Sequence, residues 1–177
     1  MNLRKIIKRN SATALGMAFA LSFAASSYAA TSDEVDLSTA MPGAGQVTTA
    51  NGLNVRSGPS TSAGKVAALP DGTNFMIIER TNSAWDLIQY DTAGHYGYVS
   101  RAYMREYDLD WYCVVKAGGI SLNMRSGKGT SYGIVASIPD GRSMPELTNT
   151  GSWDYVLWGN KAGYVSSTYI ERKRYIK

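Results

Sequence analysis

The sequence has very little of two residue types that serve in nucleophilic catalysis and metal binding: among 177 residues there is one cysteine, Cys113, and one histidine, His95. A single cysteine cannot form an internal disulfide, and Cys113 lies in an apolar run where a buried thiol is expected. A cysteine nucleophile needs a base oriented by a third group, and the sequence around these residues supplies none. A zinc site draws about three ligands from His, Cys, Asp and Glu, which one histidine does not support. We therefore expect no catalytic residue, no metal site and no cofactor.

Long hydrophobic runs are also missing. The main apolar stretch, residues 12–25, is short for a helix that spans a bilayer. It follows a basic start and ends in the small-residue exit Ser-Tyr-Ala at residues 27–29. This order predicts a cleaved signal peptide over residues 1–29. We therefore expect an exported protein, located in the cell wall, the periplasm or the extracellular space, with no stable membrane span after cleavage.

Excess charge of one sign is absent once the signal segment is set aside. Four of the 18 basic residues lie there, which leaves 14 against 14 acidic residues. The basic pI of the whole chain is therefore no indication of nucleic-acid binding. The remaining charge is uneven, because residues 112–177 carry nine basic and four acidic residues, several of the bases at the end. This region could meet an anionic wall polymer or simply form a solvated basic tail.

The chain contains an internal duplication. The segment LNVRSGPSTSAGKVAALPDG, which opens at Leu53, returns as LNMRSGKGTSYGIVASIPDG at Leu122, an offset of 69. Later landmarks recur at slightly smaller offsets, among them Gly-Tyr-Val-Ser at residues 97–100 and 163–166. Small slips of register are expected where loops differ in length. The repeat predicts two similar domains in tandem.

Each copy has the pattern of an all-β domain. Short alternating apolar stretches are separated by turn signals such as Pro-Asp-Gly at residues 70–72 and 139–141, and no longer segment has a helical pattern. A copy of this size favours a small closed or nearly closed β-barrel, because closure removes exposed sheet edges. The strands predicted for the first copy are residues 46–49, 53–55, 65–69, 75–80, 85–90 and 96–100.

The predicted organisation has five parts. Residues 30–45 are rich in Thr, Ala, Gly and acidic residues and predict a flexible tether. The full set is a signal peptide (1–29), the tether (30–45), a first barrel (46–107), a connector (108–111) and a second barrel with a basic C-terminal tail (112–177).

The string Leu-Asn-Val-Arg-Ser-Gly-Pro-Ser from Leu53, a later Trp, Gly-Tyr-Val-Ser and a final Tyr resemble the bacterial SH3-like domain (SH3b, or SH3 type 3), and the resemblance extends to both copies. It implies a small barrel of exported bacterial proteins that binds cell-wall peptidoglycan or targets wall hydrolases. The chain departs from the family in having Tyr98 and Tyr164 where a Trp is usual. The second copy also has Lys128-Gly129 in place of Pro59-Ser60, so the two copies need not share a ligand.

Recurrent aromatic and polar residues are the candidate ligand-binding residues. Tyr and Trp present a flat apolar face with one hydrogen-bond donor, and Arg presents a planar fork for carboxylates, which suits sugars and short peptides. In a small barrel, recurrent rings within the strands more often belong to the core, whereas the two tyrosines beyond the last strand suit either role. The two arginines equally suit a ligand or the carbonyls of the following loop. The candidates are Asn54, Arg56, Trp85, Tyr98 and Tyr103 in the first copy and Asn123, Arg125, Trp153, Tyr164 and Tyr169 in the second. Rings found in one copy only, Tyr132 and Trp158, are predicted to lie on the surface.

These observations favour an exported, non-catalytic protein that binds peptidoglycan or its stem peptides through two modules with added avidity. The alternative is an envelope or extracellular adaptor that grips an extended or Pro-rich segment of another exported protein. A glycosidase would need two carboxylates across a cleft, and Asp71, Asp86 and Asp140 are more simply turn or edge residues. We expect no enzyme activity and no nucleic-acid partner.

Overall fold

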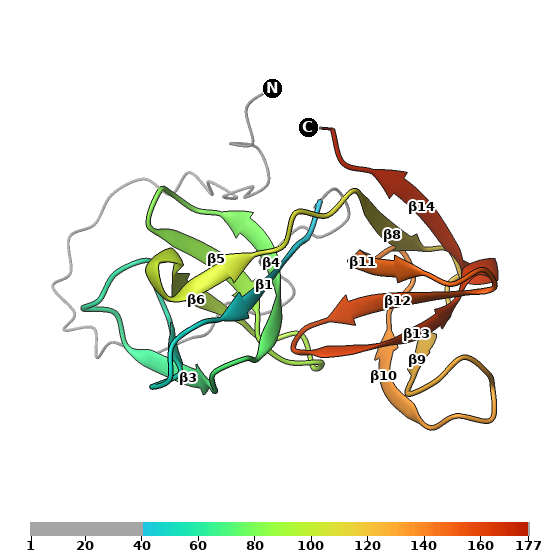
Figure 1. Cartoon of the computed structure of the whole chain (residues 1–177), viewed down its shortest axis with the longest axis horizontal. Coiled ribbons are helices and arrows are strands. Elements are labelled where there is room, and N and C mark those ends of the chain that lie inside the picture. Colours follow the sequence, from blue (N-terminus) through green and yellow to red (C-terminus); the bar gives the residue numbers. More distant parts are fainter. Residues whose placement is uncertain (1–40, 177) are drawn as a thin grey trace, which may run out of the picture.

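The computed structural model describes residues 41–176 and shows an all-β protein of two similar units side by side (Figure 1). The predicted signal peptide and most of the predicted tether lie outside this range. Within it, no helix has the length and apolar character needed to cross a membrane. We call the units the first and the second repeat.

The two repeats have the same strand order. The first contains β1 (Gly43–Val47), β2 (Leu53–Arg56), β3 (Lys65–Leu69), β4 (Asn74–Arg80), β5 (Trp85–Gln89), β6 (Tyr96–Ser100), the 3-10 helix η1 (Arg101–Tyr103) and β7 (Met104–Glu106). The second contains β8 (Trp111–Val115), β9 (Leu122–Arg125), β10 (Ile134–Ile138), β11 (Ser143–Asn149), β12 (Trp153–Trp158), β13 (Lys161–Ser166), η2 (Ser167–Tyr169) and β14 (Ile170–Arg174). The antiparallel orders are β3-β2-β6-β5-β4-β1-β7 and β10-β9-β13-β12-β11-β8-β14.

Every stretch predicted as a strand in the first repeat overlaps an observed strand, although residues 46–49 share only Gln46 and Val47 with β1. Two differences concern the first and last strands of the repeat. β1 begins at Gly43, inside the segment predicted as tether, because this strand pairs with both β4 and β7. The short β7 was not predicted, since it has only three residues, two of them exposed and charged. Pairing with β1 makes these residues a strand.

The Pro-Asp-Gly turns form as predicted. Thr73 N donates to Pro70 O at 3.2 Å, and Arg142 N donates to Pro139 O at 3.3 Å. Gly72 and Gly141 have φ of 73° and 78°, in the left-handed region where glycine is favoured.

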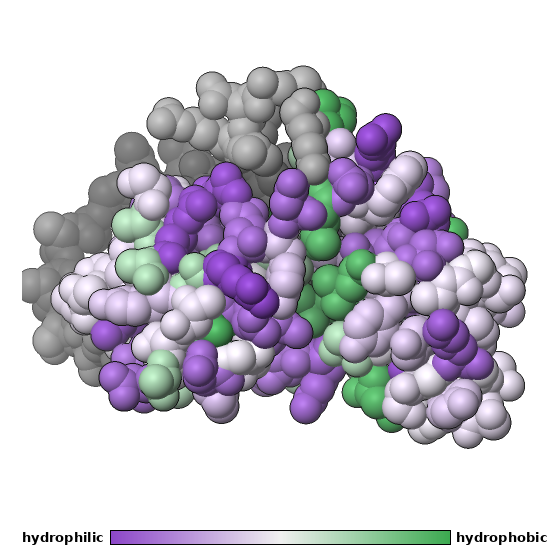
Figure 2. All heavy atoms as spheres, viewed as in Figure 1, coloured by the Kyte–Doolittle hydropathy of each residue, from purple (hydrophilic) through white to green (hydrophobic). Residues whose placement is uncertain are grey.

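The hydrophobic interior shows why the repeats form one body. On β4, Phe75 and Ile77 belong to the first repeat's own core, whereas Met76 and Ile78 belong to a cluster that also holds core residues of the second repeat, such as Met144. Successive side chains of a strand point to opposite faces, so β4 is buried on both. Hydrophobic residues gather along the seam between the two lobes in Figure 2.

The turn between β12 and β13 anchors this junction, and it points toward the first repeat in Figure 1. Met76 N donates to Gly159 O at 2.9 Å, and the Trp158 indole donates to Thr92 O at 3.2 Å. Trp158 is 3% exposed, so the prediction that it lies on the surface is wrong. Tyr90, at the equivalent position of the first repeat, packs against that repeat's own core instead.

Candidate functional site

Each repeat has a surface groove at the same place in the fold. Three parts of the repeat form its walls: the loop before the second strand, the second strand, and the 3-10 helix together with the strand that leads into it. The groove volume is about 420 Å³ in the first repeat and about 210 Å³ in the second. Seven equivalent positions line both grooves with identical residue types, namely Leu53, Asn54, Arg56, Thr61, Trp85, Ser100 and Tyr103 in the first and Leu122, Asn123, Arg125, Thr130, Trp153, Ser166 and Tyr169 in the second.

The two aromatic residues of each groove differ in burial. Trp85 and Trp153 begin β5 and β12 and are half-buried, so each ring contributes to the fold and presents an edge to its groove. Tyr103 and Tyr169 end the 3-10 helices and are 54% and 48% exposed. The exposed tyrosines are therefore available for ligand contact at little cost to folding.

Arg56 and Arg125 play matched structural parts. The Nη1 of Arg56 donates to Ala63 O at 2.7 Å, and the Nη1 of Arg125 donates to Tyr132 O at 2.8 Å. Each bond ties the groove to the loop that follows β2 or β9. A guanidinium has five N–H donors, so an arginine that orders its loop can also bind a ligand. Each is the only charged residue among those that line its groove.

Tyr98 and Tyr164 are not among the groove residues. Tyr98 packs, partly buried, against the cluster at the junction. Tyr164 packs against Tyr155 with the two rings tilted by 41° and their centroids 4.8 Å apart, and the Lys128 Nζ lies 5.7 Å from the centre of the Tyr164 ring. These two predicted candidates do not line the grooves, although each pairs across the strands with a groove arginine, Arg56 or Arg125. The fold brings the other eight together in two groups of four.

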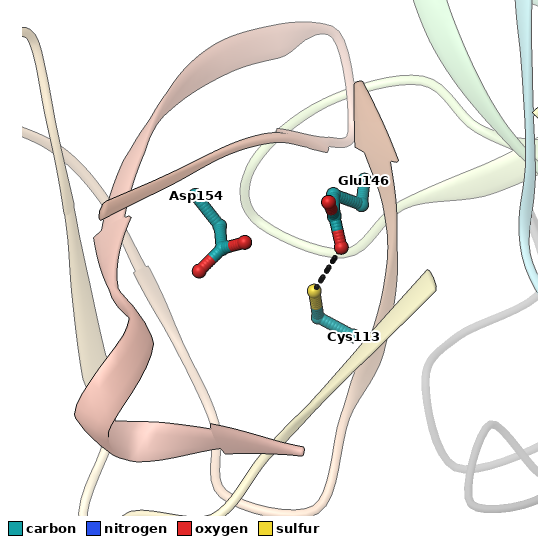
Figure 3. Close-up of side chains that lie close together, drawn as sticks. All are labelled: Cys113, Glu146 and Asp154. Atoms are coloured by element: carbon teal, nitrogen blue, oxygen red, sulfur yellow. Dashed lines mark hydrogen bonds between the residues drawn. The ribbon is translucent and has the colours of Figure 1, made fainter. Parts of the chain in front are cut away.

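A buried polar cluster in the second repeat joins Cys113, Glu146 and Asp154, whose side chains point toward one another (Figure 3). Their potential ligand atoms lie within 4.8 Å of one another, and the Cys113 thiol donates to Glu146 at 3.5 Å. Arg172 from β14 donates two hydrogen bonds to Glu146, both at 2.7 Å. Burial, reinforced by the Glu146 carboxylate, raises the pKa of the Cys113 thiol. Arg172 and the protonated thiol therefore satisfy this cluster internally, and it is better suited to stability than to metal binding or nucleophilic attack.

This cluster also changes the interpretation of the basic C-terminal residues. Residues 170–174 form the end strand β14. Arg172 pairs with Glu146 and, together with Arg174, lies over the Trp111 ring, while Lys173 lies 3.7 Å from Glu171. Glu146 was missed as a cluster residue, although an acidic residue within an apolar strand is a signal of a buried ion pair.

Asp86 occupies the position equivalent to Asp154 and is buried at the second residue of β5, so its assignment as a turn or edge residue is wrong. Neither carboxylate oxygen of Asp86 has a hydrogen-bond partner among the described residues. Arg101 lies 3.8 Å away. Burial raises the pKa of Asp86 to about 6, against the opposing effect of Arg101. Asp71 and Asp140, by contrast, are turn residues, and each accepts hydrogen bonds from nearby backbone N–H groups.

His95 is engaged elsewhere, in the loop between β5 and β6. Its Nδ1 pairs with Asp91 at 2.6 Å. The His95 hydrogen bonds are the main reason that the pKa of Asp91 lies below its ordinary value despite partial burial. Cys113 is buried and bonded to Glu146, so the structure does not pair the one thiol with the one imidazole.

Comparison with known proteins identifies a family and several relatives of this chain. Residues 51–105 match the family described as "Bacterial SH3 domain". A Bacillus subtilis protein named "Putative N-acetylmuramoyl-L-alanine amidase YrvJ" is 29% identical over 127 residues, 67% of this chain but only 24% of that protein. Two uncharacterized B. subtilis proteins are similar over shorter segments: YraJ is 35% identical, covering 35% of this chain and 67% of that protein, and YraI is 51% identical, covering 34% and 65%.

The family match covers most of the first repeat, from before β2 into β7, and the second repeat shares the strand order and the groove of the first. The first repeat also contains the Leu-Asn-Val-Arg-Ser-Gly string, the Trp and the Gly-Tyr-Val-Ser segment on which the resemblance was based. By this domain and by its similarity over two thirds of YraJ, the chain belongs to the bacterial SH3 domain family.

Proposed function

We propose that this protein is exported and binds cell-wall peptidoglycan without chemical turnover, through the grooves of its two repeats. The observation that carries the proposal is the recurrence of seven identical groove residues in two copies. Each groove combines apolar ring faces with amide, hydroxyl and guanidinium groups, which suits sugars and short peptides. The amidase named among the relatives supports a link to the wall, since that name describes action on a peptidoglycan bond.

The composition of the grooves favours binding over catalysis. Among the residues that line them there is no carboxylate, imidazole or thiol. General acid–base and nucleophilic mechanisms use such groups within reach of the reacting bond. The grooves therefore support recognition of a polymer, with two weak sites adding avidity.

The test is co-sedimentation of the protein with purified peptidoglycan, with and without its anionic polymers, over a series of salt concentrations. We expect retention that survives both stripping and salt. Truncating both exposed groove tyrosines, Tyr103→Ala with Tyr169→Ala, should lower retention about tenfold or more, because two ring contacts are lost. Each single variant should retain intermediate binding.

The matched control is Tyr132→Ala, which removes a tyrosine of similar exposure, 51%, that lines neither groove. It should leave retention unchanged. Retention lost on stripping would place binding on the basic residues of the second repeat instead. If the wild type does not sediment with the wall at all, the proposal fails.

A second candidate function, the adaptor, is favoured by one feature of the second repeat. Its end strand β10 carries exposed Ile134 and Val135, 56% and 38% exposed, where the equivalent β3 begins with Lys65. An end strand without such a charge can add an extended segment of another protein. Cross-linking to an exported protein that Ile134→Lys abolishes, together with indifference to wall material, would support this function.

A further inference from the structure

The two grooves differ along one wall, which is the loop between the first and second strands of each repeat. In the first repeat the loop spans residues 48–52 and contributes Thr49 and Asn51 to the groove. In the second it spans residues 116–121, is one residue longer, and contributes Ala117, Ile120 and Ser121. Thr49 and Asn51 are thus replaced by the alkyl side chains of Ala117 and Ile120, although Ser121 adds a hydroxyl group where the first groove has Gly52. The rest of the groove is largely shared.

The apolar wall of the second groove is held in place by Asp140. This residue belongs to the Pro-Asp-Gly turn, and its carboxylate accepts hydrogen bonds from Ala117 N and Gly119 N, both at 2.7 Å. These bonds hold the pKa of Asp140 below its ordinary value, so its carboxylate is charged at neutral pH. The equivalent Asp71 bonds only within its own turn, to Gly72 N at 2.9 Å. A loop ordered before binding loses less entropy when a ligand arrives.

Ile120 is the main new group on this wall. It is 69% exposed, and the same groove contains the Trp153 and Tyr169 rings and buried Leu122. Covering a large alkyl side chain that is otherwise exposed to water is favourable, so Ile120 would strengthen the binding of a ligand that buries it. The groove also offers Asn123 and Thr130 for backbone amides, and its volume is half that of the first groove. These properties fit a short peptide with small alkyl side chains.

We infer that the grooves divide the ligand between them: the second binds a short peptide segment with alanine-like side chains, and the first binds the hydroxyl-rich and amide-rich glycan. In the first groove Thr49 and Asn51 replace the alkyl wall with hydrogen-bonding groups. Ile120 is then the residue that decides specificity, and Asp140 is its positioning residue. This inference rests on the proposed function, since both ligand parts occur in one polymer.

The test uses the two groove tryptophans as separate reporters. Trp85 and Trp153 line different grooves, so their indole N–H signals in NMR spectra report each site. We expect trialanine to shift the Trp153 signal and to bind there more tightly than triglycine. The trimer of N-acetylglucosamine should shift the Trp85 signal. Ile120→Asn should weaken trialanine binding about fivefold, the loss expected for one alkyl contact.

The control is Asn51→Ile, the converse change at the equivalent position. It should leave trialanine affinity at Trp153 unchanged and weaken binding of the sugar trimer at Trp85. Ile120 is largely exposed, so its replacement should leave the melting temperature within about 2 °C of wild type.

Two results would overturn the division of the ligand. One is an equal response of both indoles to both probes, and the other is unchanged trialanine affinity in Ile120→Asn. Selective trialanine binding at Trp153 by a protein that wall material does not retain would support the specificity of the groove while refuting the proposed function.

Discussion

Replacing Gly159 with alanine should disrupt the junction between the repeats and lower the melting temperature by roughly 10 °C. A Cβ at this position would lie 1.9 Å from the Asp91 carbonyl oxygen and 2.9 Å from Thr92 N, both backbone atoms that no rotamer change can move. The residue also has φ of 58°, in the left-handed region. This clash is relieved only if the β12–β13 turn moves away from the first repeat. A cost of about 3 kcal/mol or more follows from the clash and the loss of junction packing, and for a chain of this size it corresponds to the stated shift.

The matched control is Gly151→Ala in the turn between β11 and β12. Gly151 has φ of 93°, but nothing lies within 4 Å of an added Cβ. This variant carries the backbone strain, about 1–2 kcal/mol, without the clash. In thermal unfolding, Gly159→Ala should therefore have a lower melting temperature than Gly151→Ala.

Hydrogen exchange locates the damage. The Met76 amide and the Trp158 indole both donate across the junction, to Gly159 O and Thr92 O. Gly159→Ala should speed exchange at both groups, whereas Gly151→Ala should leave them protected. Equal loss of stability and equal exchange in the two variants would mean that the turn contributes only its own conformation.

The consequence for function is geometric. Because the repeats share a core, the two grooves are held at a fixed orientation, and binding to a repetitive polymer depends on matching that spacing. Gly159→Ala leaves every groove residue intact. It should therefore weaken wall retention while the binding of short probes to the individual grooves persists.

Much of this architecture could be predicted from the duplication. Strands recur with their flanking turn residues, because Pro-Asp-Gly and the alternating apolar pattern are local signals. The groove residues could be selected for the same reason: a Trp, an Arg and a Tyr kept at equivalent positions in both copies must suit the same place in the same fold. Eight of the ten selected positions line the grooves.

What could not be predicted depends on contacts between the repeats. The run Phe75–Met76–Ile77–Ile78 is apolar on both faces of β4, a sign that both are covered, but the sequence does not show by what. Trp158 is buried at the junction, whereas its counterpart Tyr90 packs against the first repeat's own core. Tyr98 is partly buried there as well, a contact between the repeats that the sequence does not reveal.

The largest pH-dependent effect should come from Asp86, which is equivalent to Asp154 of the second repeat. Asp86→Asn should raise the melting temperature at pH 7 and above, by about 5 °C. In the folded protein burial raises the pKa of Asp86 from 3.8 to about 6, so folding favours the neutral form. The cost of ionisation is absent below about pH 4, grows between pH 4 and 6, and is complete above pH 6. The pKa difference corresponds to roughly 3 kcal/mol at most, and this net cost already includes the attraction between Asp86 and Arg101.

Asp154→Asn should have the opposite effect, although it changes the same position of the other repeat. Asp154 accepts hydrogen bonds from Asn149 Nδ2, at 2.7 Å, and from the Ser167 hydroxyl. An amide at this position would leave one of these donors without an acceptor, which costs about 1–3 kcal/mol.

Thermal unfolding of the wild type and both variants from pH 4 to pH 8 separates the two aspartates. The advantage of Asp86→Asn should shrink toward zero at pH 4, where the wild-type carboxyl is already neutral, and Asp154→Asn should be less stable than wild type at pH 7. The charged groups near Asp86 are Arg101, Arg80 and Glu106, and their effects on its pKa oppose one another. If Asp86→Asn destabilises the protein at pH 7 as much as Asp154→Asn does, the carboxylate is held by Arg101 as an effective ion pair. If it stabilises as expected, one of two duplicated aspartates has lost its hydrogen-bond donors, because Arg101 stands where the second repeat has Ser167.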